Sequence, residues 1–185
     1  MNQLSGGFAD PAIESAIAFR AVLNVTARPG RIERMSGHHG PEPISVAAAT
    51  LLLVLADRTT PLHLAGAHDT PALRQWIAFH CGAPIVSAEE ASFALGHWSA
   101  LMPLGRFAIG TPEYPDRSAT LIVDGHDFGG DRAELTGPGI KGTARMAVPE
   151  RAAFVANRAL FPLGWDAYLC GGDQLAALPR STEVR

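Results

Sequence analysis

The chain of 185 residues is long enough for one domain with a sizeable core, and its 47% hydrophobic and 18% charged residues exclude a disordered protein. The formal net charge is −3 and Lys and Arg form no run, which argues against a nucleic-acid partner or an anionic membrane surface. Lys141 is the only lysine, so any anion site would rely on arginine side chains and backbone amides.

The sequence gives no indication of export or of a membrane span. The longest apolar run, residues 46–56, is too short to cross a bilayer and suits a buried helix. The first residues, MNQLSGGFADP, lack the basic start and apolar block of a signal peptide. Cys81 and Cys170 lie far apart and match neither a metal-binding nor a redox pair. We therefore expect a cytoplasmic protein with reduced thiols.

The first predicted element is a helix that begins after Asp10, a residue suited to cap it, with Pro11 in the first turn. Its expected apolar stripe comprises Ile13, Ala16, Ile17, Ala21 and Val25. A short extended piece follows near residues 28–35, and a loop occupies 36–43.

An apolar helix over residues 44–56 comes next, and its consecutive leucines predict burial nearly all round. Residues 61–66 form a plausible strand. Thr70 is expected to cap a further helix, which Gly82 follows.

The second half of the chain is richer in strands. Short strands are expected at 83–87, 92–96 and 133–137, and the strongest candidate is 118–125, because Thr120 to Val123 is β-rich and nearly all apolar. A helix covers 149–160. Residues 165–179 form a hairpin, with Gly171 and Gly172 supplying positive φ at its turn. The alternation of helices and strands predicts a single α/β domain with a mixed sheet between helical layers.

The stretch ELTGPGIKG, residues 134–142, is either a glycine turn or a nest for an anion. Its spacing matches neither the P-loop nor the dinucleotide fingerprint, and Pro138 removes one backbone donor. Lys141 beside two glycines fits an exposed side chain better than a Schiff-base residue.

Residue patterns of familiar catalytic or metal sites are missing from the sequence. The adjacent His38 and His39, and the segment DGHD at 124–127, read as surface loops rather than metal ligands. No G-x-S-x-G serine elbow occurs. We expect no metal and no cofactor, and the residues alone do not indicate an enzyme.

Six segments, taken in order and spacing, carry a resemblance over nearly the whole chain. They are FRAVLNVTARPG, LLLVLADRTTPLHL, FHCGAPIV, GTPEYPDRSATLI, LTGPGI and FPLGWDAYLCGGDQLAALPRST. Together they resemble the PhnH family, whose members are components of the bacterial carbon–phosphorus lyase system. Two small departures are RST near the end, where RTT is usual, and SGHHG at 36–40, which is not a family motif.

The resemblance implies a three-layer α/β/α sandwich with a mixed sheet, similar to pyridoxal-phosphate-dependent transferases but without the cofactor and its lysine. It implies a homodimer that joins subunits G, I and J in a core complex. That complex serves phosphonate catabolism and forms alpha-D-ribose 1-methylphosphonate 5-triphosphate from ATP and methylphosphonate. We expect a structural, non-catalytic component; the alternative is a subunit that binds the phosphonate or nucleotide phosphate during transfer.

Two sets of candidate residues follow, within one domain spanning residues 1–185 that has loose ends at 1–9 and 181–185. The candidate anion-binding set is Arg20, Arg28, Thr136, Gly137, Gly139 and Arg180. The candidate interface set is Trp98, Met102, Phe107, Phe161 and Trp165. The alternatives are that the arginines make structural ion pairs and that the aromatic residues cap the core from loops.

Overall fold

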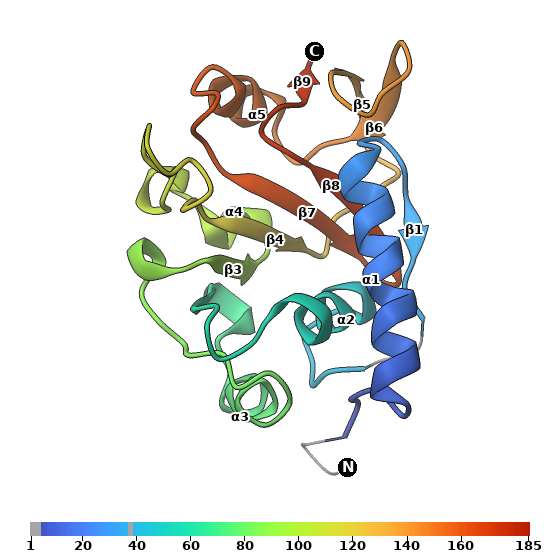
Figure 1. Cartoon of the computed structure of the whole chain (residues 1–185), viewed down its shortest axis with the longest axis vertical. Helices are drawn as coiled ribbons and strands as arrows, with labels where there is room; N and C mark the ends of the chain where they lie inside the picture. Colours follow the sequence, from blue (N-terminus) through green and yellow to red (C-terminus); the bar gives the residue numbers. More distant parts are fainter. Residues whose placement is uncertain (1–4, 37–38) are drawn as a thin grey trace.

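The computed structural model describes residues 5–36 and 39–185 (Figure 1). The helices are α1 (Pro11–Ala27), α2 (Val46–Leu55), α3 (Pro71–His80), α4 (Trp98–Leu101) and α5 (Arg151–Arg158), with short 3-10 turns η1 (Gly66–His68), η2 (Ala88–Glu90) and η3 (Leu104–Arg106). The strands are β1 (Glu33–Arg34), β2 (Leu62–Leu64), β3 (Phe93–Gly96), β4 (Thr120–Asp124), β5 (Arg132–Thr136), β6 (Ala144–Ala147), β7 (Asp166–Gly171), β8 (Gln174–Leu178) and β9 (Glu183–Val184). None of the helices in these ranges has the length and apolar character needed to span a bilayer.

The central sheet has six strands in the order β1-β8-β7-β4-β3-β2. The four strands from β7 to β2 run parallel, with Ile122 of β4 paired to Leu95 of β3 and to Tyr168 of β7. β8 returns antiparallel to β7 through a hairpin, and β1 adds an antiparallel edge. The predicted mixed sheet, the buried strand at 120–123 and the closing hairpin are therefore confirmed.

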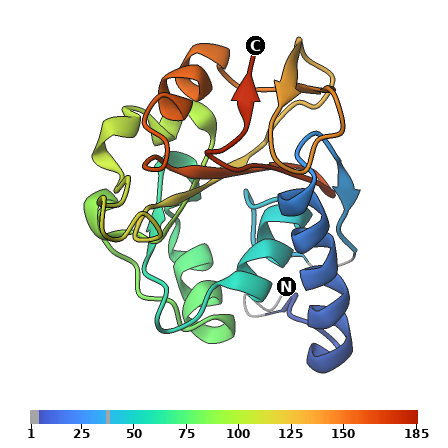
Figure 2. The ribbon, with the colours of Figure 1, turned by 45° about the horizontal axis from the view of Figure 1, so that its top comes forward.

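Apolar residues on the two faces of the sheet form two core layers. Along β4, Ile122 packs toward α1, α2 and α3, whereas Leu121 and Val123 pack toward α4 and α5. This alternation is the period of two that a strand covered on both faces requires. Figure 2 shows the sheet between the layers, with α1 and α2 on one side and α5 and β9 on the other. The three-layer α/β sandwich is confirmed.

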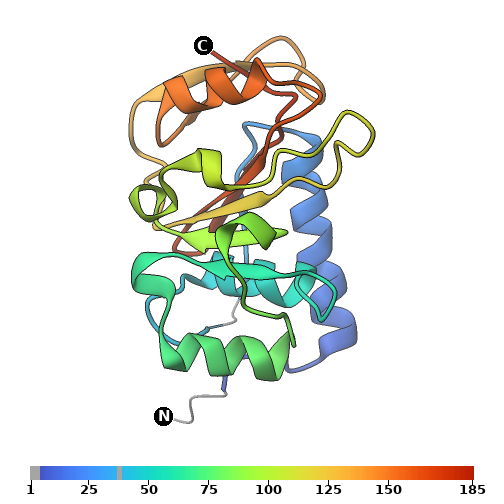
Figure 3. The same cartoon turned by 90° about the vertical axis from the view of Figure 1, so that its left-hand side faces the viewer.

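The second covering layer is not purely helical. β5 pairs antiparallel with both β6 and β9, and this three-stranded sheet lies beside α5. The sequence did not predict β6 or β9, and residues 181–185 were expected to be loose. The structure corrects that expectation, because β9 joins the sheet and Thr182 and Val184 are buried. The chain ends at the opposite pole of the molecule from its described N-terminal residues (Figure 3).

Helix starts follow the predicted chemistry. The Asp10 carboxylate accepts a hydrogen bond from the backbone N–H of Ile13 at 3.3 Å, and the Thr70 hydroxyl accepts one from Leu73 at 3.1 Å. In the same way, the Ser45 hydroxyl caps α2. Each cap satisfies one backbone donor that a helix leaves unpaired in its first turn.

The predicted apolar stripe of α1 is wrong for its first half. Ile13 and Ile17 are each 60% exposed, and the buried residues of α1 are Ala18, Val22 and Val25. Both sides of this helix are apolar, so periodicity could not show which side faces the core. By contrast, the run from Ala47 to Leu52 is buried without a break, as its composition predicted, although Leu53, Val54 and Leu55 at the end of α2 are only partly buried.

Two smaller predictions also differ from the structure. Residues 83–87 form no strand, since Ile85 makes only a single bridge to Leu62. At the turn of the closing hairpin, Gly172 alone has a positive φ, of 60°, while Gly171 does not.

Candidate functional site

The glycine-rich turn of residues 137–142 packs between two distant parts of the chain. A Cβ on Gly139, whose φ is +80°, would lie 2.0 Å from the carbonyl oxygen of Ala27, the last residue of α1. A Cβ on Gly137 would lie 3.1 Å from the carbonyl oxygen of Ser181. Close packing thus explains the glycines. The neighbouring carbonyl end of α1 carries partial negative charge, which disfavours an anion there.

The candidate arginines do not converge on this turn. Arg20 lies exposed on α1, and Arg28 follows the end of that helix, also exposed. Thr136 donates its hydroxyl hydrogen to Glu183 of β9 at 3.2 Å, an interaction within the second sheet. Lys141 is exposed. Of the three candidate arginines, Arg28 is the one whose sequence neighbour, Ala27, packs against the turn at Gly139.

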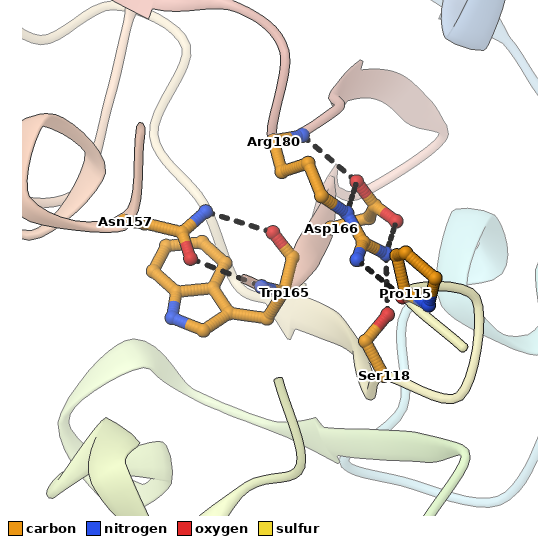
Figure 4. A network of polar contacts seen from close by, with 6 residues as sticks. All are labelled: Pro115, Ser118, Asn157, Trp165, Asp166 and Arg180. Carbon is orange, nitrogen blue, oxygen red and sulfur yellow. Dashed lines mark hydrogen bonds and ion pairs between the residues drawn. The ribbon is translucent and has the colours of Figure 1, made fainter. Parts of the chain in front are cut away.

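Arg180 joins the end of β8 to the start of β7 (Figure 4). Its guanidinium donates to both carboxylate oxygens of Asp166, to the hydroxyl of Ser118 and, at 2.7 Å, to the carbonyl of Pro115. Its backbone N–H also donates to Asp166, at 2.8 Å. The side chain is 12% exposed, and these hydrogen bonds use four of its five N–H groups within the chain. The geometry therefore matches the structural alternative for Arg180.

The five candidate interface residues divide between core and surface. Phe107 and Trp165 are 3% and 4% exposed and belong to the core beneath α4 and α5, so they offer no surface to another chain. Trp98 stacks on Phe154 at 5.7 Å and meets Trp165 edge-on at 6.3 Å. Met102 and Phe161 are exposed, at 41% and 49%. The structure thus corrects the interface assignment for two of the five.

The backbone of Trp165 is held by a buried side chain of α5. Asn157 donates from Nδ2 to the Trp165 carbonyl at 2.8 Å and accepts from the Trp165 N–H at 3.0 Å (Figure 4). These two hydrogen bonds replace the backbone partners that a buried loop lacks. The segment FPLGWD can therefore enter the core.

A cavity of about 440 Å³ lies at the carboxyl ends of β3 and β4, and we call it the strand-end cavity. Its lining includes His97, Trp98, Asp124, Gly125, His126 and Asp127. Residues 147–149, which lead into α5, close another side. Ligands of open α/β sheets bind outside the carboxyl ends of the strands, so this cavity occupies the place where the fold favours a site.

Each histidine of the strand-end cavity is fixed by a backbone carbonyl. His97 Nδ1 lies 2.9 Å from the carbonyl oxygen of Asp124, and His126 Nε2 lies 3.1 Å from that of Ala147. A carbonyl only accepts, so these nitrogens carry the hydrogen, and His97 Nε2 and His126 Nδ1 are left as acceptors in the neutral rings. Burial lowers the pKa of His126, which favours its neutral form.

Asp124 lines the cavity and is held in place by hydrogen bonds. Its carboxylate accepts hydrogen bonds, each 2.9 Å long, from His68 Nε2, from the backbone N–H of Ser45 and from that of Gly125. Burial alone would raise the pKa of Asp124, but the hydrogen bonds from His68 and Ser45 outweigh it and lower the pKa. The fully buried His68 ring stands 4.9 Å from the His97 ring. The Asp124–His68 pair thus ties β4 to η1 and to the start of α2.

The polar side chains that line this cavity offer mainly hydrogen-bond acceptors. Among the described residues, neither Lys nor Arg lines the cavity, whereas His97, His126, Asp124 and Asp127 do. Such a lining suits hydroxyl or amino groups better than phosphate. Among residues 5–36 and 39–185, no three His, Cys, Asp or Glu side chains form a group that could hold a metal ion.

Sequence reasoning treated the segment at 124–127 as a surface loop and missed this arrangement. The available signal was an aspartate that ends a buried strand directly before a glycine. A Cβ on Gly125 would lie 2.6 Å from His97 Nδ1, so the glycine is what allows the two strand ends to approach. The prediction that His38 lies in a surface loop concerns a residue outside those that the structure describes.

Comparison with known proteins gives a consistent result across the chain. The family described as "Bacterial phosphonate metabolism protein (PhnH)" matches residues 6–185. The chain is 38% identical to the alpha-D-ribose 1-methylphosphonate 5-triphosphate synthase subunit PhnH of Rhizobium meliloti, with 97% of this chain and 94% of that protein aligned. It is 30% identical to HtxG of Stutzerimonas stutzeri, a protein named as a putative C-P lyase subunit, over 90% of this chain and 84% of that protein.

Proposed function

The chain belongs to the PhnH family of bacterial phosphonate metabolism proteins, and from this membership we propose that it is a subunit of a carbon–phosphorus lyase assembly. The observation that carries the proposal is the 38% identity to the Rhizobium meliloti synthase subunit over 97% of this chain. In this role the protein supports the formation of alpha-D-ribose 1-methylphosphonate 5-triphosphate in the cytoplasm. Its partners are subunits G, I and J, and it forms a homodimer when isolated.

Two features of the described residues favour a structural over a catalytic role. The candidate anion-binding residues are spread over α1, the 137–142 turn and the β7–β8 edge, and Arg180 is committed to Asp166. Of the candidate interface residues, Met102 and Phe161 remain on the surface. Exposed methionine and phenylalanine are typical of interface centres, so we assign the homodimer contact to this pair of segments.

Genetic complementation tests the proposed function. A strain that lacks its own PhnH protein, supplied with this chain, should grow with methylphosphonate as the sole phosphorus source. The empty vector should not support growth, and both strains should grow on inorganic phosphate. Failure to restore growth, together with failure of the tagged chain to co-purify with co-expressed subunits G, I and J, would refute the proposal.

A ligand-binding role is the second candidate, and the strand-end cavity is the observation that favours it. The relative from Rhizobium meliloti is named for a ribose compound, and ribose hydroxyls are donors that His97 Nε2 and His126 Nδ1 could accept. Isothermal titration should then detect heat with adenosine as well as with ATP, and none with methylphosphonate alone. His97→Ala should remove the heat. Binding of methylphosphonate that survives His97→Ala would instead support the phosphate-binding alternative.

A further inference from the structure

The outward side of α1 carries an apolar stripe with a single charge at its centre. Its large side chains are Ile13 and Ile17, each 60% exposed, Phe19 at 44% and Leu23 at 51%. Residues four apart share a helix face, so these four form two parallel rows, and Arg20 lies between them. We call these five residues the α1 outer stripe. Figures 1 and 2 show α1 at the outside of the molecule, with α2 and the sheet on its inner side.

The composition of α1 indicates that its outer side is covered in the working protein. The inner side buries Ala18, Val22 and Val25 against α2 and the sheet, so the helix is apolar on both sides. A helix that is apolar all round is normally buried all round. Contiguous exposed apolar surface on a folded protein marks a contact with another molecule.

Arg20 distinguishes between the possible occupants. Some exposed arginines have carboxylate partners, such as Arg34 with Asp173 at 2.6 Å and Arg74 with Asp69 at 2.5 Å, whereas Arg20 belongs to those that have none within residues 5–36 and 39–185. Among the described residues, no hydrogen bond or ion pair engages the guanidinium of Arg20. Covering the stripe would bury this charge, and a buried charge without a partner is costly.

A second copy of the chain could not supply that partner. The α1 outer stripe contains no Asp or Glu, and Glu14, the carboxylate within α1, already accepts the backbone N–H of Ala9 at 2.7 Å. A two-fold contact pairs a patch with itself, so the stripe packed about its centre would place Arg20 beside Arg20. An off-centre arrangement would press each guanidinium against isoleucine, leucine or phenylalanine. Both arrangements leave two buried positive charges without a carboxylate.

We propose that the α1 outer stripe docks a different subunit of the assembly, through an apolar surface that carries one carboxylate opposite Arg20. This inference rests on the proposed function, because it takes its partner from the carbon–phosphorus lyase subunits. It places the contact on the opposite side of the sheet from Met102 and Phe161, so homodimer and hetero-subunit contacts use separate surfaces.

The test uses the tagged full chain co-expressed with subunits G, I and J. Ile17→Glu should reduce their capture by about tenfold or more, since a carboxylate would enter the centre of an apolar contact. Arg20→Glu should reduce it similarly, while Arg20→Lys should retain much of it. Val155→Glu is the matched control, an exposed β-branched residue (49%) on α5. Circular dichroism and thermal denaturation of each variant confirm that it is folded.

Three results separate the possible failures. If the wild-type chain captures none of the subunits, the proposed function itself fails. If the wild type captures them and Ile17→Glu does so equally well, or if Val155→Glu loses capture to the same degree, the docking surface is refuted. If Ile17→Glu leaves capture intact but lowers the molar mass of the isolated chain from dimer to monomer, a second copy covers the stripe and the proposal is overturned.

Discussion

Replacing Asp124 by alanine tests whether the strand-end cavity depends on its buried carboxylate. The side chain is 2% exposed and accepts three hydrogen bonds, from His68, Ser45 and Gly125. Its removal deprives the wholly buried His68 imidazole, the backbone N–H of Ser45, which caps α2, and the backbone N–H of Gly125 of their acceptor. Breaking a buried pair in this way costs about 4 kcal/mol. For a chain of this size that corresponds to a fall in Tm of about 8–16 °C.

The carboxylate also predicts how stability depends on pH. The pKa of Asp124 is lower in the folded protein than its ordinary value, so the folded state favours the charged form. Its contribution to the free energy of unfolding is therefore fully present above about pH 4 and is lost as the pH falls through the folded-state value. Asp124→Asn, which cannot ionise, should show a shallower loss of stability on acidification than the wild type.

Urea denaturation followed by circular dichroism measures both effects, at pH 7 and across the acid range. Asp127→Ala is the control, because Asp127 lines the same cavity and is exposed, and its carboxylate accepts, within the part of the chain that the structure describes, only from Gly129 in its own turn. A substitution of this kind should change the free energy of unfolding by no more than about 0.5 kcal/mol. Equal midpoints for wild type and Asp124→Ala would refute the argument that the buried pair holds β4, η1 and α2 together.

Three further predictions concern packing and the thiols. Gly139→Ala should lower the free energy of unfolding by more than about 2 kcal/mol, because its Cβ would collide with the Ala27 carbonyl. Gly142→Ala, at a similar positive φ with open space around it, should cost about 1 kcal/mol. Equal thermal shifts for the two variants would contradict the packing argument. Trp98→Ala should destabilise the isolated chain by about 2 kcal/mol in urea, since the ring covers buried aromatic residues, and an unchanged midpoint would return Trp98 to the surface candidates. Burial raises the pKa of Cys81 to about 12, so a maleimide should label it slowly at pH 8 until denaturant is added, and rapid labelling of the native chain would show that the thiol is accessible.

Local sequence determined the elements whose chemistry lies within a few residues. Asp10 and Thr70 cap their helices because each needs only the backbone N–H three positions later. The strand at 120–124 could be predicted because a run of β-branched and apolar residues suits a strand covered on both faces. The same reasoning gave the closing hairpin and therefore the mixed sheet.

Sequence alone could not decide which apolar side chains are buried. Ile13 and Val25 are equally plausible core residues by type, yet one is 60% exposed and the other fully buried. Trp165 sits among prolines and glycines, and only the two hydrogen bonds from Asn157 show why its loop can enter the core. These outcomes depend on which neighbour each face meets, and that information is spread over the whole chain.

The candidate site shows the same division. The sequence contains His97 and His126 as isolated histidines, 29 positions apart, and Asp124 as part of a polar loop. Parallel pairing of β3 with β4 puts Gly96 beside Val123, which brings the residues following each strand to one edge of the sheet. The chain by itself determined that β4 would be a buried strand, because its run of β-branched and apolar residues suits a strand covered on both faces. Only the tertiary structure decided that its end would meet His97 and His68, because long-range strand pairing, and no local pattern, sets which residues share an edge.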